Sequence, residues 1–167
     1  MNEFRFYRVA AVCSLLSAVT TLLLIFLPEL YAPAQDFDGR MARVHDPIYR
    51  VRAWVYLLHP FLVLTAALAV ANEVRRHAPA LALFGALGFL LWAATEAAQS
   101  TLTLFAFDKW RVAWAAADAA ARDSIRIWTG MYDGIWDAMY VLLLIGFAIG
   151  NLLLGSSLVQ RGGFTRV

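Results

Sequence analysis

Polar side chains stand at helical spacing inside a long apolar run, which is where this sequence could do chemistry. The run from Pro79 to Phe107 carries, at positions i, i+3, i+4 and i+7, the residues Glu96, Gln99, Ser100 and Thr103. These positions share one face of one helix. A carboxylate within a membrane-spanning helix costs roughly 2.5 kcal/mol or more near the bilayer centre, and it usually faces a partner or a cavity. This face therefore predicts a site inside a membrane.

The other apolar runs carry polar stripes of the same kind. The residues of each stripe are spaced by three, four or seven, and Asn151 lies deeper in the last run. In chain order the stripes are Ser14, Ser17 and Thr21; Arg52, Tyr56 and His59; and Asp133, Asp137, Tyr140 and Asn151. Four such faces turned inward make a helical bundle with a polar lining. Helical rise places His59, Glu96 and Asp137 roughly 10, 16 and 13 Å from the same end of the bundle. Because these depths are similar, we expect the three side chains to meet in one pocket.

The favoured function is a polar pocket within the membrane that binds or moves a small lipophilic or protonatable molecule. Besides His59, Glu96 and Asp137, its expected ligand-binding residues are Tyr56, Gln99, Ser100, Thr103, Asp133 and Tyr140. Lipid is the expected partner, and no pattern in the sequence identifies the ligand or a cofactor.

A membrane enzyme is the second interpretation. Glu96 or Asp137 would act with His59 as general acid and base on a lipophilic substrate. If the two carboxyl groups crowd each other, one keeps its proton at neutral pH and can shuttle it. A divalent metal could use the same oxygen and nitrogen atoms, but no Glu-x-x-His or His-Glu-x-x-His spacing is present, so we predict no metal site.

A non-catalytic accessory subunit is the third interpretation. Glu96 and His59 would then bond each other and hold the helices in register, as polar groups in lipid often do. Gly130-x-x-x-Gly134 and Gly146-x-x-x-Gly150 allow close packing of helices, within the bundle or between copies of the chain in a homo-oligomer.

The composition identifies a membrane protein. Hydrophobic residues make up 62% of the 167 residues and charged residues 16%, against roughly 45–50% and 25% in soluble domains. A soluble fold of this length could not bury so much apolar side chain. The net charge of +2, with dispersed basic residues, gives no indication of nucleic-acid binding, and the single cysteine, Cys13, cannot form an internal disulfide.

Four apolar runs are long enough to cross a hydrocarbon core of about 30 Å. They cover residues 9–27, 53–71, 80–107 and 127–158, and the short connections favour one domain, an up-down-up-down bundle of four transmembrane helices. Ala32-Pro33-Ala34 resembles a signal-cleavage site after the first run, but a signal core is usually only about 7–15 residues. We therefore expect the first helix to be retained.

The two ends of the predicted bundle differ in composition. The segment from Lys109 to Arg126 mixes charges with tryptophan and alanine, which predicts a short amphipathic helix that lies at the membrane interface or extends the third span. Trp and Tyr concentrate at this end, as in an interfacial belt. The short segments at the opposite end, including a basic tail at residues 161–166, are denser in arginine. That density favours a multi-pass protein of the cell membrane with both termini cytoplasmic.

Overall fold

The computed structural model describes residues 3–31 and 33–160, and these residues form helices and no strand. The long helices are α1 (Glu3–Phe26), α3 (Pro47–Val74), α4 (Pro79–Leu102) and α6 (Ala119–Gln160); the short elements are η1 (Leu27–Leu30), α2 (Phe37–Ala42), η2 (Arg43–His45), η3 (Thr103–Phe107) and α5 (Asp108–Trp114). The predicted all-helical class is confirmed for this part of the chain. The basic tail and Ala32 of the cleavage-like motif lie outside the described residues.

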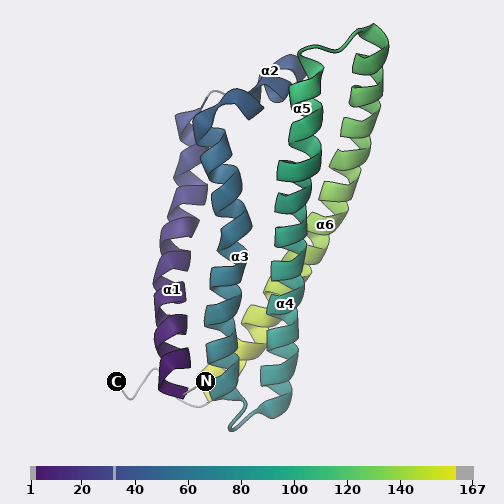
Figure 1. Cartoon of the computed structure of the whole chain (residues 1–167). Helices are drawn as coiled ribbons and strands as arrows, with labels where there is room; N and C mark the ends of the chain where they lie inside the picture. The colour runs from purple at the N-terminus through teal and green to yellow at the C-terminus, as the bar shows by residue number, and fades with distance from the viewer. Residues whose placement is uncertain (1–2, 32, 161–167) are drawn as a thin grey trace.

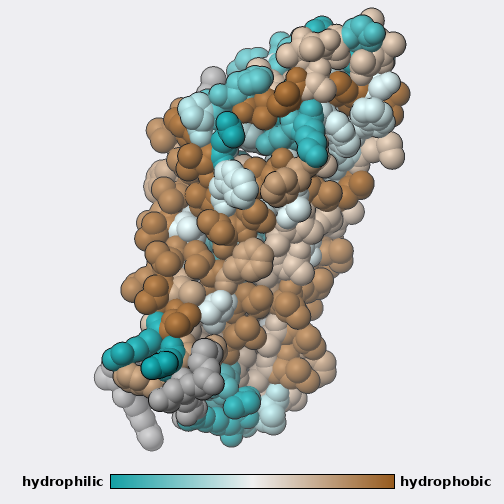
Figure 2. All heavy atoms as spheres, in the orientation of Figure 1, coloured by the Kyte–Doolittle hydropathy of each residue, from teal (hydrophilic) through white to brown (hydrophobic). Residues whose placement is uncertain are grey.

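Four helical stretches are long and apolar enough to cross a membrane. They cover Phe4–Leu30, Pro47–Val74, Pro79–Trp114 and Ala119–Val159, and each contains one of the predicted apolar runs. Figure 2 shows apolar residues covering the middle of the visible face, with hydrophilic residues gathered toward the two ends. Such a broad apolar surface suits lipid and not water. The fold therefore fits a multi-pass membrane protein.

The second span begins earlier than the apolar run at residues 53–71 indicated, because α3 begins at Pro47. The Asp46 side chain caps this helix by accepting hydrogen bonds from the backbone N–H of Ile48 (2.7 Å) and of Tyr49 (3.1 Å). Proline suits the first position of a helix, where its missing N–H costs nothing. Asp46 followed by Pro47 thus indicates that the helix starts before the apolar run at residue 53. Hydropathy alone does not detect this start.

The segment from Lys109 to Arg126 does not form a helix of its own. α4 continues through η3, one turn of π-helix, into α5, and the residues from Ala119 onward belong to α6. The first part of the segment therefore extends the third span, which was one of the two expected arrangements. A helix lying flat on the membrane stays a prediction.

α4 is the central helix of the molecule. Figure 1 shows α1, α3 and α4 side by side, with α6 crossing α4 and the described chain beginning and ending at the same end of the molecule. α4 packs against both α3 and α6, whereas α1 packs mainly against α3. We call the end near the described termini the terminal half. The other end, where α2, η2 and α5 cover α3, α4 and α6, is the cap half.

In the terminal half, α4 and α6 are in backbone contact at glycine residues. A Cβ atom added to Gly88 would stand 2.6 Å from the backbone N of Gly150 and 2.9 Å from the backbone O of Gly146. Only glycine allows so close an approach, so the Gly146-x-x-x-Gly150 pair packs helices within the chain. At Gly130 and Gly134 an added Cβ meets no described atom within 4 Å, so contact between copies through that pair stays a prediction.

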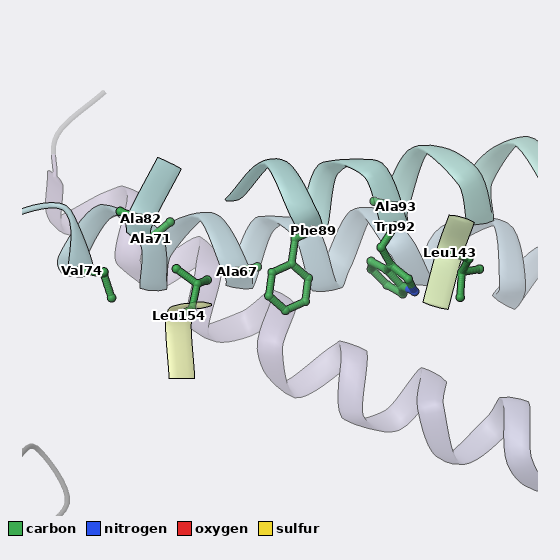
Figure 3. Close-up of a cluster of buried hydrophobic side chains, with 9 residues drawn as sticks. All are labelled: Ala67, Ala71, Val74, Ala82, Phe89, Trp92, Ala93, Leu143 and Leu154. Carbon is green, nitrogen blue, oxygen red and sulfur yellow. The ribbon is translucent and has the colours of Figure 1, made fainter. Parts of the chain in front are cut away.

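An apolar core packs around this crossing in the terminal half, beside an open groove of about 450 Å³ that Ser14, Ser17 and Asn151 help to line. Figure 3 shows its members, which come from α3, α4 and α6: Ala67, Ala71, Val74, Ala82, Phe89, Trp92, Ala93, Leu143 and Leu154. Phe89 and Trp92 are its largest side chains, and the alanines let the helices approach one another. This core supports α4 directly below its polar face.

Candidate functional site

A cavity of about 100 Å³ lies between α3, α4 and α6 in the cap half. Its lining residues are Tyr49, Arg52, Ala53, Tyr56, Ser100, Thr103 and Trp136. Of the predicted binding residues, Tyr56, Ser100 and Thr103 line it directly. Thr103 also begins the π-helical turn η3, and such turns are frequent at functional sites.

Two hydrogen bonds fix α6 against α4 at the level of this cavity. Gln99 Nε2 donates to the backbone O of Trp136 (3.0 Å), and the hydroxyl groups of Thr103 and Tyr132 lie 2.6 Å apart. The face of α6 that meets α4 thus carries Tyr132 and Trp136, and further along the packed glycines. This face is offset by one residue, or about 100° of rotation, from the stripe that contains Asp133 and that the sequence favoured.

Buried polar groups in the cavity lining or next to it lack partners within the described chain. Arg52 lines the cavity, whereas Gln99 and Glu96 do not and lie near its lining residue Ser100 on α4. Arg52 Nε and Gln99 Oε1 are buried and make no hydrogen bond to a described residue. Glu96, one turn before Ser100 on α4, is 4% exposed, and no described residue forms a hydrogen bond or ion pair with its carboxyl group. The Tyr56 hydroxyl lies within electrostatic range of that carboxyl group. A buried polar group left unpaired costs about 1–3 kcal/mol, so a cluster of them is a candidate binding site.

His59 is held by α1 and not by Glu96. Its Nδ1 atom lies 2.8 Å from the hydroxyl oxygen of Thr20, and its ring meets the ring of Trp92 edge to face, with centroids 5.9 Å apart. Within the described residues, no hydrogen bond or ion pair joins His59 to Glu96. The polar stripe predicted for the first helix contained Ser14, Ser17 and Thr21. It did not include Thr20, because the partner of His59 depends on how α1 packs against α3.

The polar residues expected on α6 do not line the cavity. Arg40 Nη1 donates to Asp133 Oδ2 (2.8 Å), and Arg40 Nη2 donates to the other carboxylate oxygen. This hydrogen bonding raises the pKa of Arg40 above its usual value, and it ties α2 to α6. Asp137 is exposed, and Tyr140 is 48% exposed. The expected meeting of Asp137 with His59 and Glu96 therefore does not occur, because that stripe of α6 faces away from α4.

No metal centre is formed by the described residues. They contain no group of three or more His, Cys, Asp or Glu side chains arranged to hold an ion. Of the side chains that could bind a divalent metal, Asp137 is exposed on α6, and His59 is bonded to Thr20 and not to Glu96.

A network of charges and rings closes the cap half next to the cavity. Arg111 donates to Asp108 Oδ1 (2.9 Å) and to the hydroxyl of Tyr49, and its guanidinium lies 4.3 Å from the centre of the Phe107 ring. These side chains are buried. Tyr49 belongs to both the network and the cavity lining, so the network positions one wall of the cavity. Sequence reasoning missed it, although Asp108 and Arg111 stand at i and i+3 on one helix.

Comparison of the chain with protein-family models, with curated proteins and with solved structures gave no match.

Proposed function

We propose that this chain is a multi-pass protein of the cell membrane whose cavity binds the polar end of a small lipophilic or protonatable molecule. In this proposal the four spans alternate in direction, both termini are cytoplasmic, and the cap half lies toward the opposite surface. The arginine density of the short segments near the termini supports that orientation.

The observation that carries the proposal is the set of unpaired polar groups beside the cavity. Arg52 Nε offers an unused donor, and Gln99 Oε1 offers an unused acceptor. The Glu96 carboxyl group can accept or donate according to its protonation. A ligand that carries both a donor and an acceptor would satisfy these groups together.

The volume of the cavity limits what can enter it. Pockets that enclose a whole drug-sized molecule are about 300–1,000 Å³, whereas this cavity is about 100 Å³. It therefore suits a carbonyl, hydroxyl, amine or carboxyl group at one end of a ligand. The apolar remainder of such a molecule would lie among the helices or in the lipid.

An acid–base enzyme is the alternative that one specific feature favours. Glu96 is a buried carboxyl group with no hydrogen-bond partner in the described chain, and the Tyr56 hydroxyl lies near it. Such a group can exchange a proton with a substrate bound beside it. In this version Glu96 would be the catalytic residue, while His59, bonded to Thr20, would support the fold.

Native mass spectrometry of the protein extracted in mild detergent tests the binding proposal. The test variant is Gln99→Leu, which removes the unused acceptor together with the hydrogen bond from Nε2 to the backbone O of Trp136. A loss of ligand therefore counts only if the thermal unfolding of this variant matches that of the wild type. The matched control is Thr101→Val, because Thr101 is exposed on the same helix and its hydroxyl bonds only to the backbone O of Ala97 (2.7 Å). We expect the wild type and the control to retain a bound small molecule, and Gln99→Leu to retain it about tenfold less, the effect of one buried hydrogen bond.

Two outcomes would contradict binding: a wild-type protein that carries no small molecule, or equal retention by all three proteins. The Glu96→Gln variant separates the enzyme from the binding protein. If the molecule stays bound to Glu96→Gln but is no longer converted, Glu96 is catalytic. The control for that change is Glu29→Gln, which makes the same substitution at an exposed position in η1.

A further inference from the structure

A second hollow lies on the outer face of the cap half, away from the cavity described above. It is an open groove of about 470 Å³ between η2, the first turns of α3 and the segment from η3 to α5. His45, Arg50 and Lys109 line its rim, and Trp54 and Phe105 line its apolar part. The groove thus has a basic end and an apolar end.

The basic side chains of this groove are available to a ligand. His45, Arg50 and Lys109 are exposed, and no described residue forms a side-chain hydrogen bond or ion pair with them. Asp108 also lines the groove. Its carboxylate is engaged by Arg111 (2.9 Å) and by the hydroxyl of Tyr49 (3.4 Å), and Arg50 lies within electrostatic range of it. Arg50 and Lys109 stand against one carboxylate that Arg111 already pairs, so the net charge of the rim is positive.

The apolar part of the groove continues along α3. The rings of Trp54 and Phe105 meet edge to face, with centroids 6.1 Å apart. A shallow hollow of about 400 Å³ adjoins the groove. It shares Arg50 and Trp54 with the groove and extends past Val55 to Leu58. Leu58 lies eight positions beyond Arg50, or roughly 12 Å further along the helix. One continuous surface therefore leads from exposed cations to lipid-facing apolar side chains.

We propose that this surface binds an anionic phospholipid. His45, Arg50 and Lys109 contact the phosphate and headgroup, and one acyl chain lies along Trp54 and the α3 hollow. The charge of the rim complements an anionic headgroup. The apolar track runs inward from that rim, which is the order of groups in a phospholipid. The groove shares no lining residue with the polar cavity. The proposal requires that the spans cross a bilayer, and it does not depend on what the cavity binds.

Native mass spectrometry with defined lipids tests this proposal. Purified protein in neutral detergent is titrated with dioleoyl-phosphatidylglycerol or with dioleoyl-phosphatidylcholine, which differ in headgroup charge and share acyl chains. We expect the wild type to prefer phosphatidylglycerol. In the double variant Arg50→Gln/Lys109→Gln we expect about 25-fold weaker binding of that lipid, because each basic residue near an anionic lipid contributes about fivefold.

The controls separate headgroup recognition from general charge and from folding. Arg5→Gln removes a cation at the opposite end of the molecule and should keep the preference. Arg50→Lys/Lys109→Arg retains both charges and should keep it also. Circular dichroism checks that every variant has wild-type helix content. Equal binding of the two lipids by the wild type, or an unchanged preference in the double glutamine variant, overturns the proposal. Displacement of the lipid by equimolar inorganic phosphate overturns it too, because the groove would then recognise free phosphate.

Discussion

The terminal half and the cap half hold the same helices together in opposite ways. In the terminal half, the backbones of α4 and α6 touch at Gly88 and Gly146, and apolar side chains pack around that contact. An open groove of about 450 Å³ lies beside it, between α1, α3 and α6. In the cap half, the aromatic residues Tyr132 and Trp136 stand between the same two helices, and hydrogen-bonded charges close the end. The contact between α4 and α6 is therefore made by backbone in the terminal half and by side chains in the cap half, where a small polar cavity lies beside it.

This difference explains why the polar face of α4 meets a cavity in the cap half. Two helices that cross at one point diverge on either side of it, and the size of the side chains decides whether the space is filled. Glycine fixes the crossing in the terminal half. Large rings hold the helices apart in the cap half, where the polar face of α4 meets the cavity. The glycine contact thus sets how α4 and α6 diverge, and this divergence lets the polar face of α4 meet the cavity.

Removing Arg111 should cause the largest loss of stability, because it breaks the closure of the cap half. Arg111→Met leaves the carboxylate of Asp108 buried without its cation, which costs about 3–5 kcal/mol. Unfolding in mixed micelles would measure the change. The double variant Arg111→Met/Asp108→Asn should recover part of that loss, since no uncompensated charge remains. A single variant as stable as the wild type would contradict the role given to this ion pair.

Separating the helices in the terminal half should have the next largest effect. Gly88→Val places side-chain atoms against the backbone of Gly146 and Gly150, and overpacking of this kind costs about 2–3 kcal/mol. The matched change Gly134→Val meets open space and should alter the unfolding free energy by less than about 0.5 kcal/mol. If the two variants were equally stable, the crossing would not be the contact that holds this half.

The bond between His59 and α1 should contribute a smaller amount. Thr20→Val removes the hydroxyl that lies 2.8 Å from His59 Nδ1, at a cost of about 1 kcal/mol. Thr21→Val is the control, because the Thr21 hydroxyl bonds only to the backbone O of Ser17. Thermal unfolding in detergent distinguishes them. Equal melting temperatures for the two variants would show that His59 does not depend on α1.

The Arg40–Asp133 pair should contribute least, although its geometry is bidentate. Its side chains are 33% and 41% exposed, so water and salt screen the attraction. Arg40→Gln should cost about 0.5–1 kcal/mol. Repeating the measurement in high salt should reduce that difference, and a cost that does not change with salt would mean that α2 is held mainly by packing.

The sequence predicted the helical class, the four apolar runs and the polar face of α4, because all three depend on local pattern. It did not predict which face of α6 packs inward. The stripe through Asp133 and Asp137 and the stripe through Tyr132 and Trp136 differ by one residue, and the choice between them depends on how α6 crosses α4. The partner of His59 and the Arg111 network were missed for a similar reason, since Thr20 and Tyr49 reach them from other helices.

A high-resolution map of the protein extracted together with its native lipids tests the central claim most directly. We expect non-protein density in the cavity of the cap half, within hydrogen-bonding distance, about 2.7–3.2 Å, of Gln99 Oε1 and Arg52 Nε. A map in which protein side chains fill the cavity and pair with those two atoms would contradict it.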